Sequence, residues 1–164
     1  MKIILVANVS ANGVVQRMEQ LNYYQASQAV AGQAIGKALQ CGALIVGRKT
    51  YEMLSGMEAL APVLKSLHVV VLTRGAMDNV STAKTPQEAV RILTEAGKQE
   101  AVLAGGVAAY NAFLQAELVS EMFLGVMPVM LRGDRLEIEC PSQRLQLKDC
   151  IKLDEETVQL HYSL

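Results

Sequence analysis

Basic and hydroxyl side chains follow two apolar segments of the sequence, at the points where those segments end. Arg48, Lys49 and Thr50 come directly after "ALIVG", and Thr73 and Arg74 come directly after "HVVVL". Arginine binds phosphate through paired hydrogen bonds, and lysine adds a compact positive charge. Each of these groups alone is also typical of a solvated helix start. Their shared position after an apolar run favours an anion-binding site.

A third apolar segment, "AVLA", ends in the pair Gly105-Gly106. Because glycine has no Cβ, its backbone can approach a phosphate closely. A lone glycine pair is more often an ordinary turn. Here an expected helix follows the pair, and the free N–H groups at helix starts favour anions. The three segments together predict a site for a pyrophosphate with at least one further phosphate, as in NADPH.

Apolar strands that alternate with helices must position these groups. We expect strands at residues 2–9, 43–47, 68–74 and 101–104, and helices at residues 24–40, 48–54, 86–96 and 107–116. Such alternation favours a mostly parallel sheet that helices cover on both faces. In open α/β sheets, ligands bind outside the carboxyl ends of the strands. The three candidate segments all lie at such ends.

The pattern changes after residue 118. Residues 120–133 predict a strand that Pro128 breaks, and residues 144–164 alternate apolar and polar side chains around an acidic loop at 154–157. This alternation predicts an antiparallel hairpin at the end of the chain. With no linker or repeat in the sequence, we expect one α/β domain over residues 1–164.

Composition restricts the class of protein. The 164 residues are 51% hydrophobic and carry a net charge of -1, which favours a compact globule and disfavours a nucleic-acid partner. Cys41, Cys140 and Cys150 have no metal-ligand or disulfide-framework spacing, and His68 and His161 lie in strand-like runs. No segment approaches the roughly 20 apolar residues of a membrane span, and no signal peptide is evident. We therefore expect a cytoplasmic protein without metal or membrane partner.

Four motifs in order, "VANVSANGVV", "ALIVGRKTYE", "VVVLTR" and "VLAGGVAAYNAFL", resemble those of the dihydrofolate-reductase-like superfamily. The segment "LVSEMFLGVMPVMLRGD" is more specifically similar to the branch related to the reductase domain of the bifunctional riboflavin-synthesis deaminase-reductase. The resemblance spans nearly the whole chain. It implies a single-domain dihydrofolate-reductase-like fold, NADPH as cofactor, a small-molecule substrate and a homodimer.

The resemblance also implies roles for individual residues. Two arginines and a threonine would hold the adenosine 2′-phosphate, the start of the helix after the second strand would meet the pyrophosphate, and the glycine pair would cover it. The first strand would offer its backbone to the nicotinamide amide, and a tyrosine would pack near the cofactor. The implied cofactor-binding residues are Ala7, Gly47, Arg48, Lys49, Thr50, Thr73, Arg74, Gly105, Gly106, Val107, Ala108 and Tyr110.

The substrate side departs from the family. Folate-reducing relatives carry a carboxylate on the first helix, but residues 23–40 contain no Asp or Glu. Where the riboflavin-type enzymes commonly have an acid after the first strand, this chain has Asn12, which cannot transfer a proton as a carboxyl group does. The catalytic residue is therefore unknown. The candidate substrate-binding residues are Asn8, Ser10, Asn12, Tyr23 and Tyr24, whose alternative role is a turn with two packing tyrosines.

Three functions remain open from the sequence. The first is an NADPH-dependent reductase of a ribosylamino-pyrimidine phosphate, and the second is a related reductase of a different small heterocycle. The third is a protein that binds NADPH without turnover. The segment after "ALIVGRKTYE" lacks the Asp-x-Pro element that riboflavin-type reductases commonly place near the substrate phosphate, so the first two functions stay unresolved.

Overall fold

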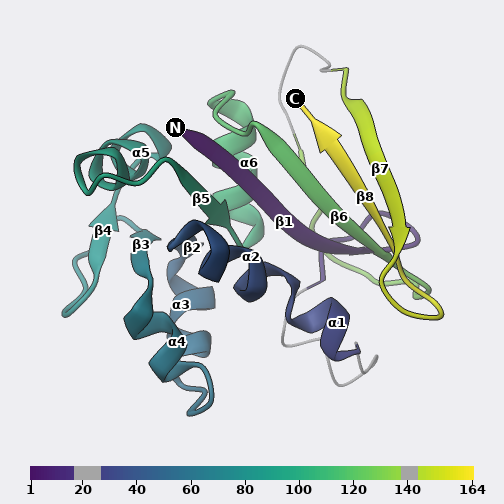
Figure 1. Cartoon of the computed structure of the whole chain (residues 1–164), viewed down its shortest axis with the longest axis horizontal. Coiled ribbons are helices and arrows are strands. Elements are labelled where there is room, and N and C mark those ends of the chain that lie inside the picture. Colours follow the sequence, from purple (N-terminus) through teal and green to yellow (C-terminus); the bar gives the residue numbers. More distant parts are fainter. Residues whose placement is uncertain (17–26, 138–143) are drawn as a thin grey trace.

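A central sheet runs through the part of the chain that the structure, a computed structural model, describes: residues 1–16, 27–137 and 144–164. Its eight strands follow the order β4-β3-β2-β5-β1-β6-β8-β7 (Figure 1). They are β1 (Lys2–Ser10), β2 (Ala43–Gly47), β3 (His68–Leu72), β4 (Ser81–Ala83), β5 (Glu100–Leu103), β6 (Glu121–Met127), β7 (Gln146–Lys152) and β8 (Val158–Ser163). The first six named strands pair in parallel, and β8 and β7 add antiparallel pairs. The predicted fold class is confirmed.

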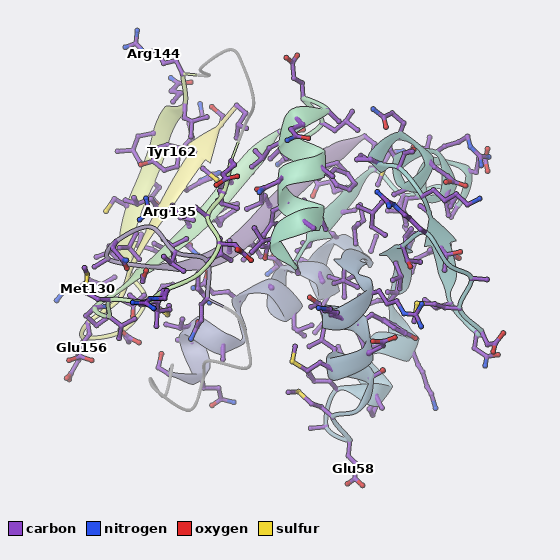
Figure 2. The ribbon with its side chains drawn as sticks, turned by 180° about the vertical axis from the view of Figure 1, so that it is seen from behind. Glu58, Met130, Arg135, Arg144, Glu156 and Tyr162 are labelled. Atoms are coloured by element: carbon purple, nitrogen blue, oxygen red, sulfur yellow. The ribbon has the colours of Figure 1, made fainter. Side chains whose placement is uncertain are left out.

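Helices cover both faces of this sheet. They are α1 (Gln28–Ala31), α2 (Gln33–Cys41), α3 (Arg48–Ser55), α4 (Ala61–Ser66), α5 (Pro86–Glu95) and α6 (Val107–Gln115). The helices α2, α3 and α4 share a buried cluster on one face, and α5 and α6 share the cluster on the other. Seen from behind, α6 lies in front of the sheet (Figure 2). Because both faces are buried, the central strands are apolar at nearly every position.

The predicted single helix over residues 24–40 is wrong in its described part. Two helices, α1 and α2, replace it, and Gly32 ends the first and begins the second. A Cβ on Gly32 would lie 2.9 Å from the carbonyl oxygen of Gln28, so the turn needs a glycine there. Ser27 caps α1 by accepting a hydrogen bond from Val30 N, and its hydroxyl donates to Asp154 Oδ2 over 2.6 Å. The hairpin loop between β7 and β8 therefore anchors the start of α1.

Other boundaries follow the expected signals closely. The helix α5 begins at Pro86 after the cap Thr85, as Pro at a first helical position predicts. The predicted loop at 154–157 separates β7 from β8. The third strand ends at Leu72, which leaves Thr73 and Arg74 in the turn beyond it. None of the helices in the described ranges has both the length and the apolar character needed to span a membrane.

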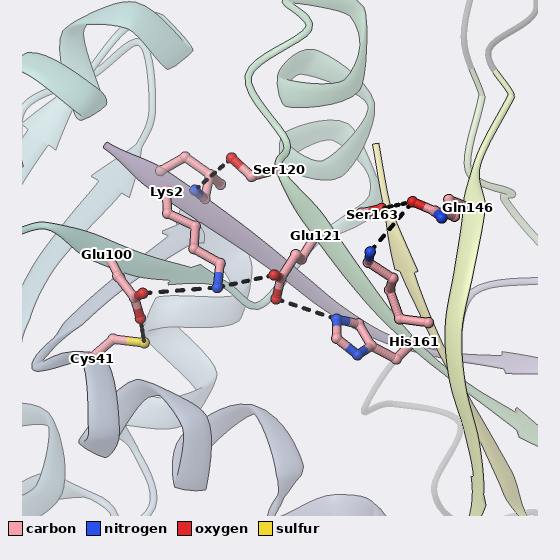
Figure 3. A network of polar contacts seen from close by, with 10 residues as sticks. Lys2, Cys41, Glu100, Ser120, Glu121, Gln146, His161 and Ser163 are labelled. Carbon is pink, nitrogen blue, oxygen red and sulfur yellow. Dashed lines mark hydrogen bonds and ion pairs between the residues drawn. The ribbon is translucent and has the colours of Figure 1, made fainter.

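A polar network ties together the strand ends opposite the candidate site (Figure 3). Lys2 Nζ lies 3.0 Å from Glu121 Oε1 and 3.8 Å from Glu100 Oε1, and His161 Nε2 lies 3.3 Å from Glu121 Oε2. The Cys41 thiol donates to Glu100 over 3.7 Å. Burial alone would raise the pKa of Glu121, but its contacts with Lys2 and His161 outweigh burial and lower that pKa. The network joins β1, β5, β6 and β8 through polar side chains.

Candidate cofactor and substrate site

The ends of β2 and β5 meet at a junction of glycines. Gly47 N donates to the carbonyl oxygen of Gly105 over 2.6 Å, and the Gly105–Gly106 peptide bond is cis. A Cβ on Gly47 would lie 3.2 Å from Gly106 N, and a Cβ on Gly105 would lie 3.3 Å from Thr50 Oγ1. Gly105 also has a φ of 112°, which side chains rarely tolerate. The junction therefore requires residues without side chains.

Two helices begin at this junction. Gly47 is the N-cap of α3 and Gly106 is the N-cap of α6, and neither helix start receives a hydrogen bond from a capping side chain. The first N–H groups of a helix lack partners within it and carry partial positive charge. Two adjacent starts of this kind favour an anion with more than one phosphate.

Arg48 reaches from the start of α3 toward the turn after β3. A Cβ on Gly75 would lie 3.4 Å from Arg48 Nη1, and Gly75 N donates to Thr73 Oγ1 over 3.3 Å. Arg48 Nε also pairs with Glu52 Oε1 at 2.7 Å, and both side chains are about half exposed. The two basic segments predicted from the sequence therefore lie side by side at one edge of the sheet, with Arg74 exposed in the same turn.

The sheet changes pairing beside the glycine junction. β1 pairs with β5 only as far as Leu5↔Leu103, whereas its pairing with β6 continues to Ser10↔Met127. Past Leu5, the buried Tyr110 hydroxyl on α6 donates to the carbonyl oxygen of Val6 over 2.7 Å. Burial raises the pKa of the Tyr110 phenol well above its usual value, so it stays a donor. Tyr110 thus provides a hydrogen-bond donor to a carbonyl group of β1 that lies beyond the last pair between β1 and β5.

The turn after β1 holds itself together by its polar side chains. Ser10 Oγ lies 2.6 Å from Asn12 Oδ1 and accepts a hydrogen bond from Val14 N over 3.0 Å. The Asn12 carboxamide donates to the carbonyl oxygen of Leu131 over 2.8 Å and accepts from Leu131 N over 3.0 Å. Asn12 therefore fastens this turn to the segment after β6. Its substrate role, and that of Ser10, stays a prediction.

Asn8 belongs to a row of residues that crosses three strands. In register, Asn8 on β1 lies opposite Gly125 on β6, and Gly125 lies opposite Gln159 on β8. Gln159 donates a hydrogen bond to the side chain of Gln33, the first residue of α2. A Cβ on Gly125 would lie 2.3 Å from Asn8 Oδ1, so a side chain at this position would displace the end of the Asn8 carboxamide. The row and Gln33 form an amide cluster on the α2 face.

The structure divides the predicted residues into groups. The glycine junction brings together the helix starts after β2 and β5, and the nearby turn after β3 adds Thr73 and Arg74. Ala7 lies buried in β1, just past the last β1–β5 pair. Tyr23 and Tyr24 lie outside the described residues. Gln33, Gly125 and Gln159 were not predicted, because the strand register aligns the last two with Asn8 and Gln33 joins them only through its contact with Gln159.

Comparisons with known proteins agree with this fold. The dihydrofolate reductase family model matches residues 2–156. A pyrimidine reductase-like protein of Corynebacterium diphtheriae is 14% identical with a TM-score of 0.73, and the match covers 99% of this chain and 91% of that one. Dihydrofolate reductase of Schistosoma mansoni is 17% identical with a TM-score of 0.73, at 99% and 98% coverage. Both identities are low, so these likenesses describe the fold.

A third structure, RibD of Acinetobacter baumannii, is 17% identical with a TM-score of 0.70, and 99% of this chain covers 57% of that protein. A comparison with curated protein sequences found no significant match. The family model, in contrast, spans nearly all of the sequence that forms the sheet and its helices. The chain belongs to the dihydrofolate reductase family.

Proposed function

We propose that this chain is an NADPH-dependent reductase that transfers hydride to a small heterocycle, with a ribosylamino-pyrimidine phosphate as the first candidate substrate. The observation that carries the proposal is the glycine junction, where two uncapped helix starts meet beside Arg48. The family and its RibD and pyrimidine reductase-like neighbours support a reductase.

The junction fits the phosphates of NADPH. Gly47, Gly105 and Gly106 leave a backbone surface that a Cβ would fill, since such an atom would come within 3.2–3.5 Å of Gly106 N or Thr50 Oγ1. Arg48, Lys49 and Arg74 are exposed and place three positive charges at this edge of the sheet. Arg48 and Arg74 would hold the 2′-phosphate, and the two helix starts would hold the pyrophosphate.

NADPH, when bound, supplies the hydride. The protein must orient the substrate and exclude water, which are the main demands of hydride transfer. The hydrogen bond from the buried Tyr110 hydroxyl to the carbonyl oxygen of Val6 would help to exclude water beside β5. Asn8 and Gln33 offer neutral amides on the substrate side. Because the described substrate side presents amides where the family commonly has an acid, we propose that water supplies the proton.

The first test is nucleotide binding by calorimetry. We expect the wild type to prefer NADPH over NADH, and Arg48→Ala to lose about 1.5–3 kcal/mol of NADPH affinity, because a charge-assisted phosphate contact is removed. NADH affinity should not change. Arg91→Ala is a matched control, because Arg91 pairs with Glu95 at 2.8 Å in the same i,i+4 geometry on α5, which packs on the other face of the sheet from α3.

The second test is oxidation of NADPH in the presence of candidate heterocycles. Failure to bind either nucleotide would overturn the proposal and leave the glycine junction as a structural element. Tight NADPH binding without oxidation by any candidate would favour a binding protein without turnover. A rate that depends on the substrate's phosphate would favour the ribosylamino-pyrimidine phosphate over other heterocycles.

A further inference from the structure

The amide cluster of Asn8, Gly125, Gln159 and Gln33 contains two buried polar atoms without a partner among the described residues. They are Asn8 Oδ1, an acceptor, and Gln33 Nε2, a donor. A buried polar atom without a hydrogen bond costs about 1–3 kcal/mol, so such atoms are rare in folded proteins. Two such atoms in one cluster, an acceptor and a donor, indicate that a hydrogen-bonding partner outside the described residues is missing.

The hydrogen bonds of the cluster fix which atoms are left free. The Asn8 amide nitrogen donates to the carbonyl oxygen of Val30 over 3.4 Å, and this contact orients the carboxamide so that Oδ1 is the end without a partner. Gln33 Oε1 accepts from Gln159, which leaves Nε2 as the free end. The two free atoms lie near one point, since a Cβ on Gly125 would be 2.3 Å from Asn8 Oδ1 and 3.7 Å from Gln33 Nε2.

We propose that Asn8 and Gln33 recognise a neutral lactam edge of the substrate, with Asn8 Oδ1 accepting from the ring N–H and Gln33 Nε2 donating to the adjacent C=O. The proposal rests on the proposed function only in assigning the ligand as the substrate. The carboxamides of Asn8 and Gln33 are both neutral, so a neutral lactam edge can pair with them without burying an unpaired charge.

The surroundings disfavour a cationic edge such as an amidinium. The Lys37 ammonium, one turn along α2 from Gln33, lies 3.5 Å from the centre of the Phe123 ring. Phe123 lies on β6, the strand that also holds Gly125. Asp154, the carboxylate that contacts the start of α1, already accepts hydrogen bonds from Ser27 and from the backbone of Glu156 and Thr157. An amidinium would also bring two donors to a site that offers one acceptor and one donor.

The test uses three small probes and the side-chain amide resonances of the whole protein by NMR. The probes are 2-pyridone, which has the N–H beside C=O, N-methyl-2-pyridone, which has only the acceptor, and benzamidine, which has only donors. We expect 2-pyridone to shift the Asn8 and Gln33 amide resonances and to bind about tenfold more tightly than either other probe, which corresponds to about 1.4 kcal/mol.

Gln33→Glu replaces the free donor with an acceptor, and we expect the preference to reverse toward benzamidine. Gln40→Glu makes the same change at an exposed position of α2 and should leave the wild-type preference intact. Gly125→Ala is a second variant, because its Cβ displaces only the end of the Asn8 side chain; it should weaken 2-pyridone without reversing the preference.

Binding of 2-pyridone and N-methyl-2-pyridone with equal affinity, or no shift of either amide resonance, overturns the proposal and favours a buried water between the two amides. A folded Gln33→Glu protein that keeps the wild-type preference overturns it as well. NADPH binding measured on the same samples separates this outcome from failure of the proposed function, because the phosphate site lies on β2, β3 and β5 and not on the amide cluster.

Discussion

Gly47 donates its backbone N–H to the carbonyl oxygen of Gly105 over 2.6 Å, and this hydrogen bond joins the carboxyl ends of two parallel strands. The helices α3 and α6 begin directly beyond these two ends. The contact therefore sets the separation of two positively polarised helix starts. The first test is whether a glycine of this contact can be replaced by a residue with a side chain.

Gly105→Ala should destabilise the fold by about 1–3 kcal/mol, because alanine is strained at a positive φ. Its Cβ would also stand 3.3 Å from Thr50 Oγ1, and NADPH binding should weaken. Urea unfolding and calorimetry measure the two effects. Gly36→Ala in α2 is the control. Nothing lies within 4 Å of a Cβ added at Gly36, so the free energy of unfolding should rise by about 0.5–1 kcal/mol. Equal effects of the two substitutions would contradict the assigned geometry.

Tyr110→Phe removes the donor to the carbonyl oxygen of Val6. We expect a loss of about 1–3 kcal/mol in the free energy of unfolding, since that acceptor is left buried and unpaired. In an ultraviolet titration, the wild-type spectrum should show a component from Tyr110 that ionises at higher pH than a free phenol and that is missing in the variant. A Tyr110→Phe protein as stable as the wild type would argue against this contact.

Glu121 should make stability depend on acid pH. The pKa of Glu121 in the folded protein lies below its ordinary value, so its contribution to stability is fully present above the pKa of the unfolded chain and is lost as the pH falls through the folded pKa. The urea midpoint of the wild type should fall faster with acid than that of Glu121→Gln. Glu95→Gln, in an exposed pair on α5, should leave the wild-type slope unchanged.

The family resemblance predicts a homodimer, and β7 is the strand we propose for the contact. It lies at the edge of the sheet, all its residues are exposed, and Leu147 and Ile151 are 54% and 44% exposed. Ile151→Lys should then shift the protein toward monomer in sedimentation velocity. Met57→Lys places the same charge on another exposed apolar residue and should not. A monomeric wild type would refute the dimer.

The sequence predicted the strands and helices that its apolar runs and caps define, and it predicted the common location of the groups around Arg48. It did not predict β4 (Ser81–Ala83) or α4 (Ala61–Ser66), because such short elements depend on their neighbours for stability. It also gave no sign of the amide cluster. Gln33 on α2 and Gln159 on β8 stand 126 residues apart and meet only in the folded chain.

The two halves of the candidate site come from different parts of the sheet. The groups proposed for NADPH lie at the ends of β2, β3 and β5, whereas the amide cluster lies on β1, β6, β8 and α2. A substitution on the hairpin β7–β8 can alter the amide cluster without touching the glycine junction. If the two sites act as proposed, a chain built this way can exchange one heterocycle for another by drift in its last strands while its source of reducing equivalents stays the same.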